Sequence, residues 1–256
     1  MLQNITRFIP VCAVLLLAAC GAPTTAVIAP PSEYGGVQDG EFFIKAVDAN
    51  LLKDGHARTE VDYAGPEAPG TIVVDTFARR LYLVQEGGRA MRYAIGVGRE
   101  GLAFSGGGVI GRKAEWPSWQ PTRNMIRTAP ELYLEYAGGV AGGLENPLGA
   151  RALYLYRGGR DSYFRIHGTI DDHSIGRASS AGCIRLFNQD AIDLYNRVPT
   201  GSAVRVRSFD ESLAIEGPFI DDANGNAVPD TPEAEAARAR VLAKRAKAGA
   251  SDLVQG

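Results

Sequence analysis

The chain has 256 residues, enough for one sizeable domain with additional segments. Its hydrophobic share of 45% and charged share of 22% are ordinary for a globular protein. The formal net charge of −2 argues against a general nucleic-acid-binding protein, which carries an excess of basic residues. Thirty-one glycines and fourteen prolines predict many turns, and therefore more sheet than helix.

Residues 1–20 have the features of a lipoprotein signal peptide and are not part of the fold, and Cys20 is expected to become the N-terminus of the mature protein. Arg7 precedes an apolar run that is too short to cross a bilayer as a helix. The run ends in Leu17-Ala18-Ala19-Cys20, which resembles the lipobox of bacterial lipoproteins, where the cysteine is lipidated. We therefore expect a lipid on Cys20 that anchors the protein to a membrane, and cleavage of an ordinary secretory signal is the alternative.

The residues after this cysteine bear on location. Gly21 follows it, and no Asp is present there to suggest retention at the inner membrane. By resemblance to bacterial lipoproteins, we expect a periplasmic protein anchored in the outer membrane. Residues 21–64 are then a tether, rich in Pro, Ala, Thr and Gly, followed by a lead-in segment that packs on the domain edge.

Short apolar runs bounded by turn residues predict a mostly β domain over residues 65–210. Glycine pairs at Gly87-Gly88 and Gly158-Gly159 each follow such a run, and this spacing is typical of β-hairpins. The expected strands are 71–75, 80–85, 92–98, 152–156, 163–167 and 203–207.

The remaining segments have other patterns. Residues 101–150 are rich in Gly and Pro, which predicts a long ordered loop region of the kind that builds a binding site over a sheet. One internal helix is expected over 189–197, with Asn188 as its cap. Residues 211–256 form a polar tail in which Pro232 starts a helix with little apolar surface, so this helix is expected to be solvated.

Cysteine usage points to one reactive candidate. If Cys12 leaves with the leader and Cys20 carries lipid, Cys183 is the one thiol that remains, in an oxidising compartment. Such a cysteine is either a buried bystander or a reactive group. His167 ends a predicted strand sixteen positions earlier, and a loop of that length can bring the two side chains together. A nearby base or positive charge lowers the pKa of a thiol and makes it a nucleophile.

Other residues beside the thiol suggest how a substrate is held. Backbone N–H groups around Gly182 and Cys183 are candidates for an oxyanion hole, and Gly168, Ala181 and Gly182 are the candidate orienting positions. Arg185 is a candidate for bidentate binding of a substrate carboxylate.

Four further residues have open or peripheral assignments. Ser180 and Trp119 are additional candidates for contact with substrate. For Trp119 the alternative is a structural role, wedging its loop against the sheet. His173 is expected in an exposed polar loop, and Arg165 on the strand face opposite His167.

Two stretches, Ile166-His167-Gly168-Thr169 and Ser179 to Leu186, together resemble the L,D-transpeptidase catalytic domain, the YkuD-like family. The family pattern is a strand ending in His-Gly-Thr, a loop, a Gly-Cys pair followed by an apolar residue and Arg or Asn, and then a helix. The resemblance runs from about Gly70 to Arg207 and includes the tryptophan–proline loop typical of one proteobacterial branch. Many members carry a second histidine where this chain has Ala181, so the base role stays with His167.

The resemblance implies a mostly β fold, a bent sheet or sandwich with one or two short helices and a long ordered loop region. It also implies acyl transfer. The thiolate of Cys183 attacks a peptidoglycan tetrapeptide stem at the L-centre of diaminopimelate, D-Ala leaves protonated by His167, and an amine of a second stem or of an envelope protein resolves the thioester. No metal or organic cofactor is required. Hydrolysis of such links, or a non-catalytic peptidoglycan-binding lipoprotein, are the alternatives.

Overall fold

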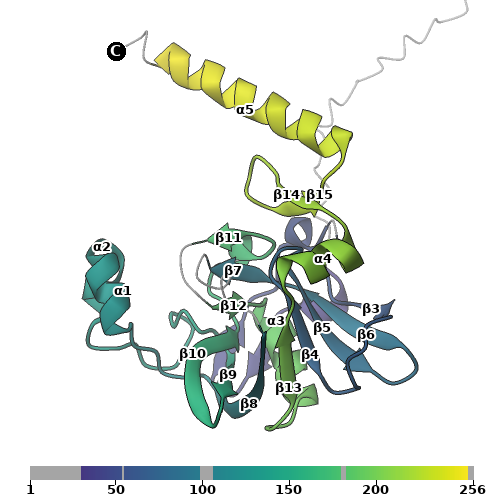
Figure 1. Ribbon diagram of the computed structural model, residues 1–256. Helices are drawn as coiled ribbons and strands as arrows, with labels where there is room; N and C mark the ends of the chain where they lie inside the picture. Colours follow the sequence, from purple (N-terminus) through teal and green to yellow (C-terminus); the bar gives the residue numbers. More distant parts are fainter. Residues whose placement is uncertain (1–29, 54, 99–105, 180–182, 253–256) are drawn as a thin grey trace, which may run out of the picture.

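The computed structural model describes residues 30–53, 55–98, 106–179 and 183–252 (Figure 1). The leader, Cys20, the start of the tether, and Ser180, Ala181 and Gly182 lie outside the described residues. Within the described ranges, no helix has the length and apolarity needed to span a bilayer.

One mixed sheet of eleven strands forms the body of the protein, which confirms the mostly β prediction. Its antiparallel meander and its second hairpin follow the glycine pairs, as expected. Three pairings are parallel, β10 with β12, β13 with β4, and β11 with β7 at the edge of the sheet. In sheet order the strands are β11 (Ala178–Ser179), β7 (Gly96–Gly98), β12 (Ile184–Arg185), β10 (Arg160–His167), β9 (Arg151–Arg157), β8 (Gly106–Glu115), β13 (Ala203–Val206), β4 (Ile72–Asp75), β5 (Arg80–Gln85), β6 (Arg89–Ala94) and β3 (Thr59–Asp62).

Strand β8 lies inside the region that was expected to be loop. Its glycines have weak strand propensity, and this hides the strand in the sequence. They are needed for close packing, because a Cβ atom on Gly108 would lie 2.7 Å from the carbonyl oxygen of Tyr156, and one on Gly111 would lie 2.2 Å from the Tyr156 ring. The same region also holds the short helices α1 (Arg123–Thr128) and α2 (Pro130–Tyr133) and a 3-10 turn, η4 (Leu134–Tyr136).

The main hydrophobic core lies between the sheet and helix α3 (Asn188–Arg197). Leu153 and Ile166 of the sheet and Ala191 and Leu194 of the helix are fully buried in it. Because Ala191 and Leu194 are three residues apart on α3, they share one face of the helix. Helix α3 therefore packs against strands β9 and β10, close to the end of β10.

The residues before the sheet pack firmly against α3. They form the hairpin β1 (Val37–Asp39) and β2 (Phe42–Ile44) and two 3-10 turns, η1 (Ser32–Tyr34) and η2 (Ala49–Leu52). Tyr34 is fully buried and donates its hydroxyl to Asp190 of α3 at 2.8 Å, and Arg58 pairs with the same carboxylate at 3.0 Å. Burial raises the pKa of Asp190 to about 7 despite these partners.

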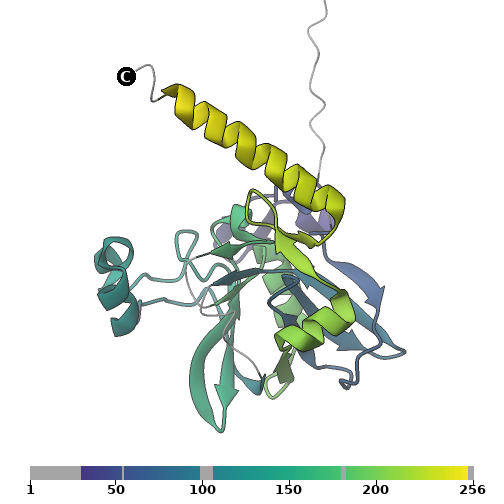
Figure 2. The same ribbon diagram turned by 45° about the horizontal axis from the view of Figure 1, so that its top comes forward.

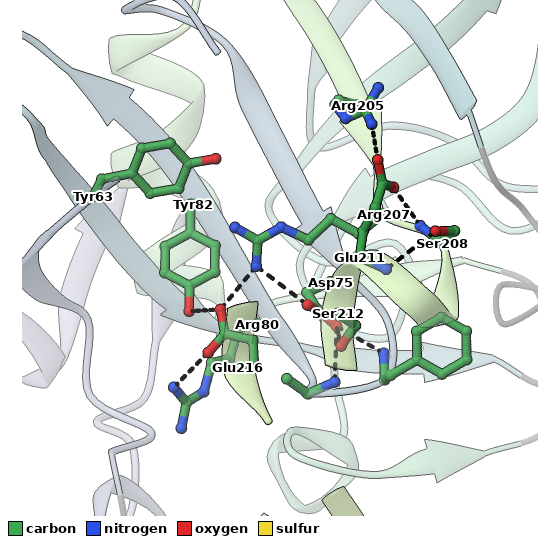
Figure 3. A network of polar contacts seen from close by, with 12 residues as sticks. Tyr63, Asp75, Arg80, Tyr82, Arg205, Arg207, Ser208, Glu211, Ser212 and Glu216 are labelled. Atoms are coloured by element: carbon green, nitrogen blue, oxygen red, sulfur yellow. Dashed lines mark hydrogen bonds and ion pairs between the residues drawn. The ribbon is translucent and has the colours of Figure 1, made fainter. Parts of the chain in front are cut away.

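The residues after the sheet return to it through helix α4 (Phe209–Glu216). A capping box between Ser208 and Glu211 starts the helix. Arg207 then pairs with Glu216 at 2.8 Å and with the fully buried Asp75 of β4 at 3.2 Å (Figure 3). This buried network joins α4 to the sheet.

Beyond α4 come the hairpin β14 (Phe219–Asp221) and β15 (Ala227–Pro229) and the helix α5 (Pro232–Asp252). Pro232 begins α5, as expected from its position. Figures 1 and 2 both show α5 extending away from the sheet. Its residues from 236 to 246 are exposed to solvent.

Arg207→Ala is expected to lower the free energy of unfolding by about 3–5 kcal/mol, because it leaves the carboxylate of Asp75 buried without its cation. Arg205→Ala is the matched control: Arg205 also pairs with two carboxylates, but its side chain is 44% exposed, and a loss of at most about 1 kcal/mol is expected. Urea denaturation measures both. Equal losses would show that burial of the network does not decide its contribution.

Candidate active site

The parallel pairing of β10 with β12 brings together the two stretches that carry chemistry. His167, the last residue of β10, is in register with Arg185, and its carbonyl accepts the N–H of Leu186 at 2.8 Å. Cys183 comes directly before β12, where its carbonyl accepts the N–H of Gly98 at 3.2 Å. Residues sixteen positions apart in the chain therefore meet at one end of the sheet.

A cavity of about 990 Å³ opens at this end of the sheet. His167, Cys183, Arg185 and Trp119 all line it, so four of the residues singled out in the sequence share one space. Its far wall comes from the 119–148 region, where Trp119 packs against the rings of two tyrosines, with centroid distances of 6.4 and 5.9 Å. These are Tyr133 and Tyr136, which the sequence did not single out because their helices are only about one turn long.

The surroundings of His167 keep its imidazole neutral. Its side chain is buried, and Nδ1 lies 2.6 Å from the carbonyl oxygen of Gly168. Because a carbonyl only accepts, this contact assigns the proton to Nδ1 and leaves the lone pair on Nε2. Burial lowers the pKa of His167 to about 4, and the positive charges of Arg185 and Arg165 act in the same direction.

Arg185 owes its place to a glycine on the neighbouring strand. It is paired with Gly96 of β7, and a Cβ atom there would lie 3.0 Å from Nε and 3.1 Å from Nη2 of the arginine. The guanidinium thus lies over Gly96, where a larger residue would collide with it. Burial lowers the pKa of Arg185, while the nearby Cys183 and Asp171 raise it. A cation beside the thiol favours the thiolate.

Comparison with known proteins agrees with this arrangement. The model of the YkuD family, the L,D-transpeptidase catalytic domain, matches residues 69–206. The chain belongs to this L,D-transpeptidase family. The matched residues include every strand of the large sheet except β3, and they include the cavity residues His167, Cys183 and Arg185.

Individual relatives carry the same family description. A putative L,D-transpeptidase of Fuscovulum blasticum is 39% identical over 137 residues, 53% of this chain and 68% of that protein. The probable L,D-transpeptidase ErfK/SrfK of Escherichia coli is 34% identical over 138 residues, 53% of this chain but 43% of that protein. The chain therefore matches less than half the length of ErfK/SrfK.

A solved structure from Brucella melitensis, described as a probable carnitine operon oxidoreductase, is 45% identical to this chain. The match covers 59% of this chain and 93% of the chain in that structure, with a TM-score of 0.43.

Asn188 has a different role from the helix cap that the sequence predicted. The cap position of α3 is Phe187, and Asn188 is the first helical residue. Its side chain instead donates to the carbonyl of Thr169 at 2.8 Å and accepts the N–H of Ala150 at 2.9 Å. Asn188 therefore ties the loop that follows His167 to the loop that precedes β9.

Gly168 leaves room for this amide, because a Cβ atom there would lie 2.1 Å from Oδ1 of Asn188. Its N–H donates to the carbonyl of Arg151 at 3.0 Å, so this group is not directed at an oxyanion. Its own carbonyl orients His167. The orienting part of the assignment for Gly168 thus has a geometric basis, and the oxyanion part does not.

The other candidates divide into placed and undescribed residues. His173 is exposed in the 3-10 turn η5 (Asp172–Ser174), as expected for a surface loop. The expectation for Arg165 is wrong: it lines the same cavity as His167, because residues two apart on a strand share a face. Ser180, Ala181 and Gly182 lie outside the described residues. In the described part of the chain, no group of three His, Cys, Asp or Glu residues could hold a metal ion.

The imidazole of His167 is expected to titrate with a pKa near 4 rather than 6.5. Since the unfolded chain takes up this proton near pH 6.5 and the folded protein only near pH 4, stability should fall as the pH drops through that window, by on the order of 3 kcal/mol. NMR of the ring in Cys183→Ala, which removes the thiol from the titration, measures the value. A pKa of 6 or above would contradict the neutral buried base.

Proposed function

We propose that the protein is a peptidoglycan L,D-transpeptidase that uses Cys183 as nucleophile and His167 as base. The observation that carries the proposal is the parallel register of β10 and β12, which brings the imidazole, the thiol and the Arg185 guanidinium to one cavity. Membership of the family supports the reaction class. The donor is a tetrapeptide stem, and the product is a new amide bond.

Acylation begins with the proton of the Cys183 thiol. The unprotonated Nε2 of His167 accepts it, and the Sγ thiolate adds to the carbonyl carbon of the L-centre, diaminopimelate, of the donor stem. Backbone N–H groups near Ala181 and Gly182 would stabilise the oxyanion. When the intermediate collapses, the C–N bond to D-Ala breaks, His167 returns the proton to the leaving amine, and a thioester remains on Sγ.

The donor stem is held by charge and by aromatic surface. Its free carboxylates suit the guanidinium of Arg185, which lines the cavity beside the thiol. Trp119 and the tyrosines beside it offer flat apolar surface to the remainder of the stem. Ser180 is a further candidate contact. The thioester is then resolved by an amine of a second stem or of an envelope protein.

The location that suits this reaction is the cell envelope. We propose that Cys20 carries lipid, that residues 21 onward form the tether, and that the enzyme is held in the periplasm at the outer membrane. The lipobox-like Leu17-Ala18-Ala19-Cys20 motivates this assignment. Labelling with a clickable fatty acid tests it, and label that persists in Cys20→Ala would refute it.

His167→Ala is expected to slow acylation of Cys183 by a donor tetrapeptide about 10²–10⁴-fold, the usual contribution of a general base. His173→Ala is the matched control, because this second histidine is exposed and does not line the cavity, so its rate should stay within about threefold of wild type. Stopped-time mass spectrometry of the intact protein gives both rates. Loss of acylation in His173→Ala with a normal rate in His167→Ala would show that His173, and not His167, is the base.

A further inference from the structure

A second cavity, of about 350 Å³, adjoins the catalytic cavity. Glu145 and Ile170 line both, so the two spaces meet at these side chains. One wall of the second cavity is formed by Phe43, Ile44 and Lys45. This wall precedes the residues that match the family model, 69–206.

Partly buried polar contacts fix this wall in place. Asp39, in the same hairpin, accepts two hydrogen bonds from the guanidinium of Arg151, at 2.6 and 2.8 Å, and one from Nε1 of Trp116, at 2.8 Å. The ring of Phe42 packs on Trp116 with a centroid distance of 4.3 Å. Gln189 of α3 also donates to the carbonyl of Lys45 at 2.9 Å.

Trp116, which lines the second cavity, has a backbone conformation that fits a built site. Its φ of 39° lies in the left-handed region, which is unusual for a bulky residue and costs on the order of 1–3 kcal/mol. The contacts from Asp39 and Phe42 hold the side chain in spite of that cost. Hydrogen bonding and ring packing therefore hold this side of the second cavity.

The two cavities differ in the sign of their charge. Three arginines and one carboxylate line the catalytic cavity, and although Asp161 pairs with Arg165, the excess there is positive. The second cavity has the carboxylates of Glu145 and Asp172 and one ammonium, that of the exposed Lys45. Burial and the neighbouring Asp171 raise the pKa of Asp172, so a cation beside this carboxylate would be favourable.

We propose that the second cavity is the acceptor subsite and that it binds a primary alkylammonium group through Asp172 and Glu145. This inference rests on the proposed transpeptidase function and adds to it the side from which the acceptor enters. The donor stem, rich in carboxylates, takes the basic cavity, and the amine-bearing acceptor takes the acidic one. The shared residues Glu145 and Ile170 then mark the passage from one to the other.

The chemistry of transfer balances in this arrangement. The ammonium releases one proton to solvent, and the neutral amine passes Glu145 and Ile170, which line both cavities, to attack the thioester carbonyl on Cys183. A C–N bond forms, the C–S bond breaks, and the second proton passes through His167 to Sγ. Water that reaches the thioester instead gives hydrolysis, so occupancy of the acceptor subsite sets the ratio of transfer to hydrolysis.

The test separates the two half-reactions. A disaccharide tetrapeptide is the donor, a tripeptide stem with a free amine is the acceptor, and the acyl-enzyme and the amide product are measured by mass spectrometry. Asp172→Asn is expected to raise the KM for the acceptor about tenfold and to change the acylation rate less than twofold. Glu41→Gln, which removes an exposed carboxylate from the β1–β2 turn outside both cavities, is the matched control and should behave as wild type.

A second variant changes the charge of the cavity in the opposite direction, and because it is expected to improve acceptor binding, its effect cannot be explained by a loss of structure. Lys45→Glu makes the second cavity more acidic and is expected to lower the KM for the acceptor and to raise the ratio of transfer to hydrolysis. Unchanged acceptor kinetics in both Asp172→Asn and Lys45→Glu would overturn the inference, and so would a parallel loss of acylation and transfer in Asp172→Asn. Absence of an acyl-enzyme in the wild-type protein would instead overturn the proposed function.

Discussion

The parallel pairing of β10 with β12 is the constraint on which the rest of the site depends. Strands β10 and β12 are neighbours in the sheet but are separated in the chain by the loop that carries His173, and their parallel register places the end of β10 beside the end of β12. His167 is then paired with Arg185, and Cys183 lies directly before β12. The same burial that fixes this end of the sheet keeps His167 neutral, which the proposed base role requires.

Two glycines leave the space that the polar side chains next to the site occupy. Gly96 gives the guanidinium of Arg185 its space, and Gly168 gives the amide of Asn188 its space. In both cases a Cβ atom would meet polar side-chain atoms at 3.1 Å or less, so the requirement is for room and not for an unusual backbone angle. Substitution of Gly168 would displace the amide of Asn188, whereas a Cβ atom on Gly96 would lie 2.4 Å from the carbonyl oxygen of Ser174, so substitution there would shift the backbone as well as Arg185.

The sequence predicted the sheet better than the contacts of individual residues. Short apolar runs located β4, β5, β9 and β10, and alternation located β13, where burial on one face imposes a period of two. Strand β8 was missed because packing against Tyr156 requires glycines that lack strand propensity. Asn188 was assigned as a cap because caps and loop clamps use the same amide, and only the fold shows which N–H and carbonyl groups lie within reach.

The sequence could not predict the second cavity, for a related reason. Its charged residues, Lys45, Glu145 and Asp172, lie in three separate segments, and no local pattern brings them together. The hairpin that carries Lys45 is attached through Asp39 to Arg151 and Trp116, and such distant pairs leave no periodic signal. The candidate nucleophile Cys183 and the candidate base His167 could be predicted, because each lies in a short sequence motif.

The most direct test of the account is the mass of the intact protein after it is mixed with a peptidoglycan tetrapeptide in the absence of acceptor. The account expects a covalent adduct on Cys183 equal to the stem minus D-Ala, labile to hydroxylamine as a thioester should be. Binding of the tetrapeptide without an adduct would contradict it and would favour a non-catalytic peptidoglycan-binding protein with the same fold.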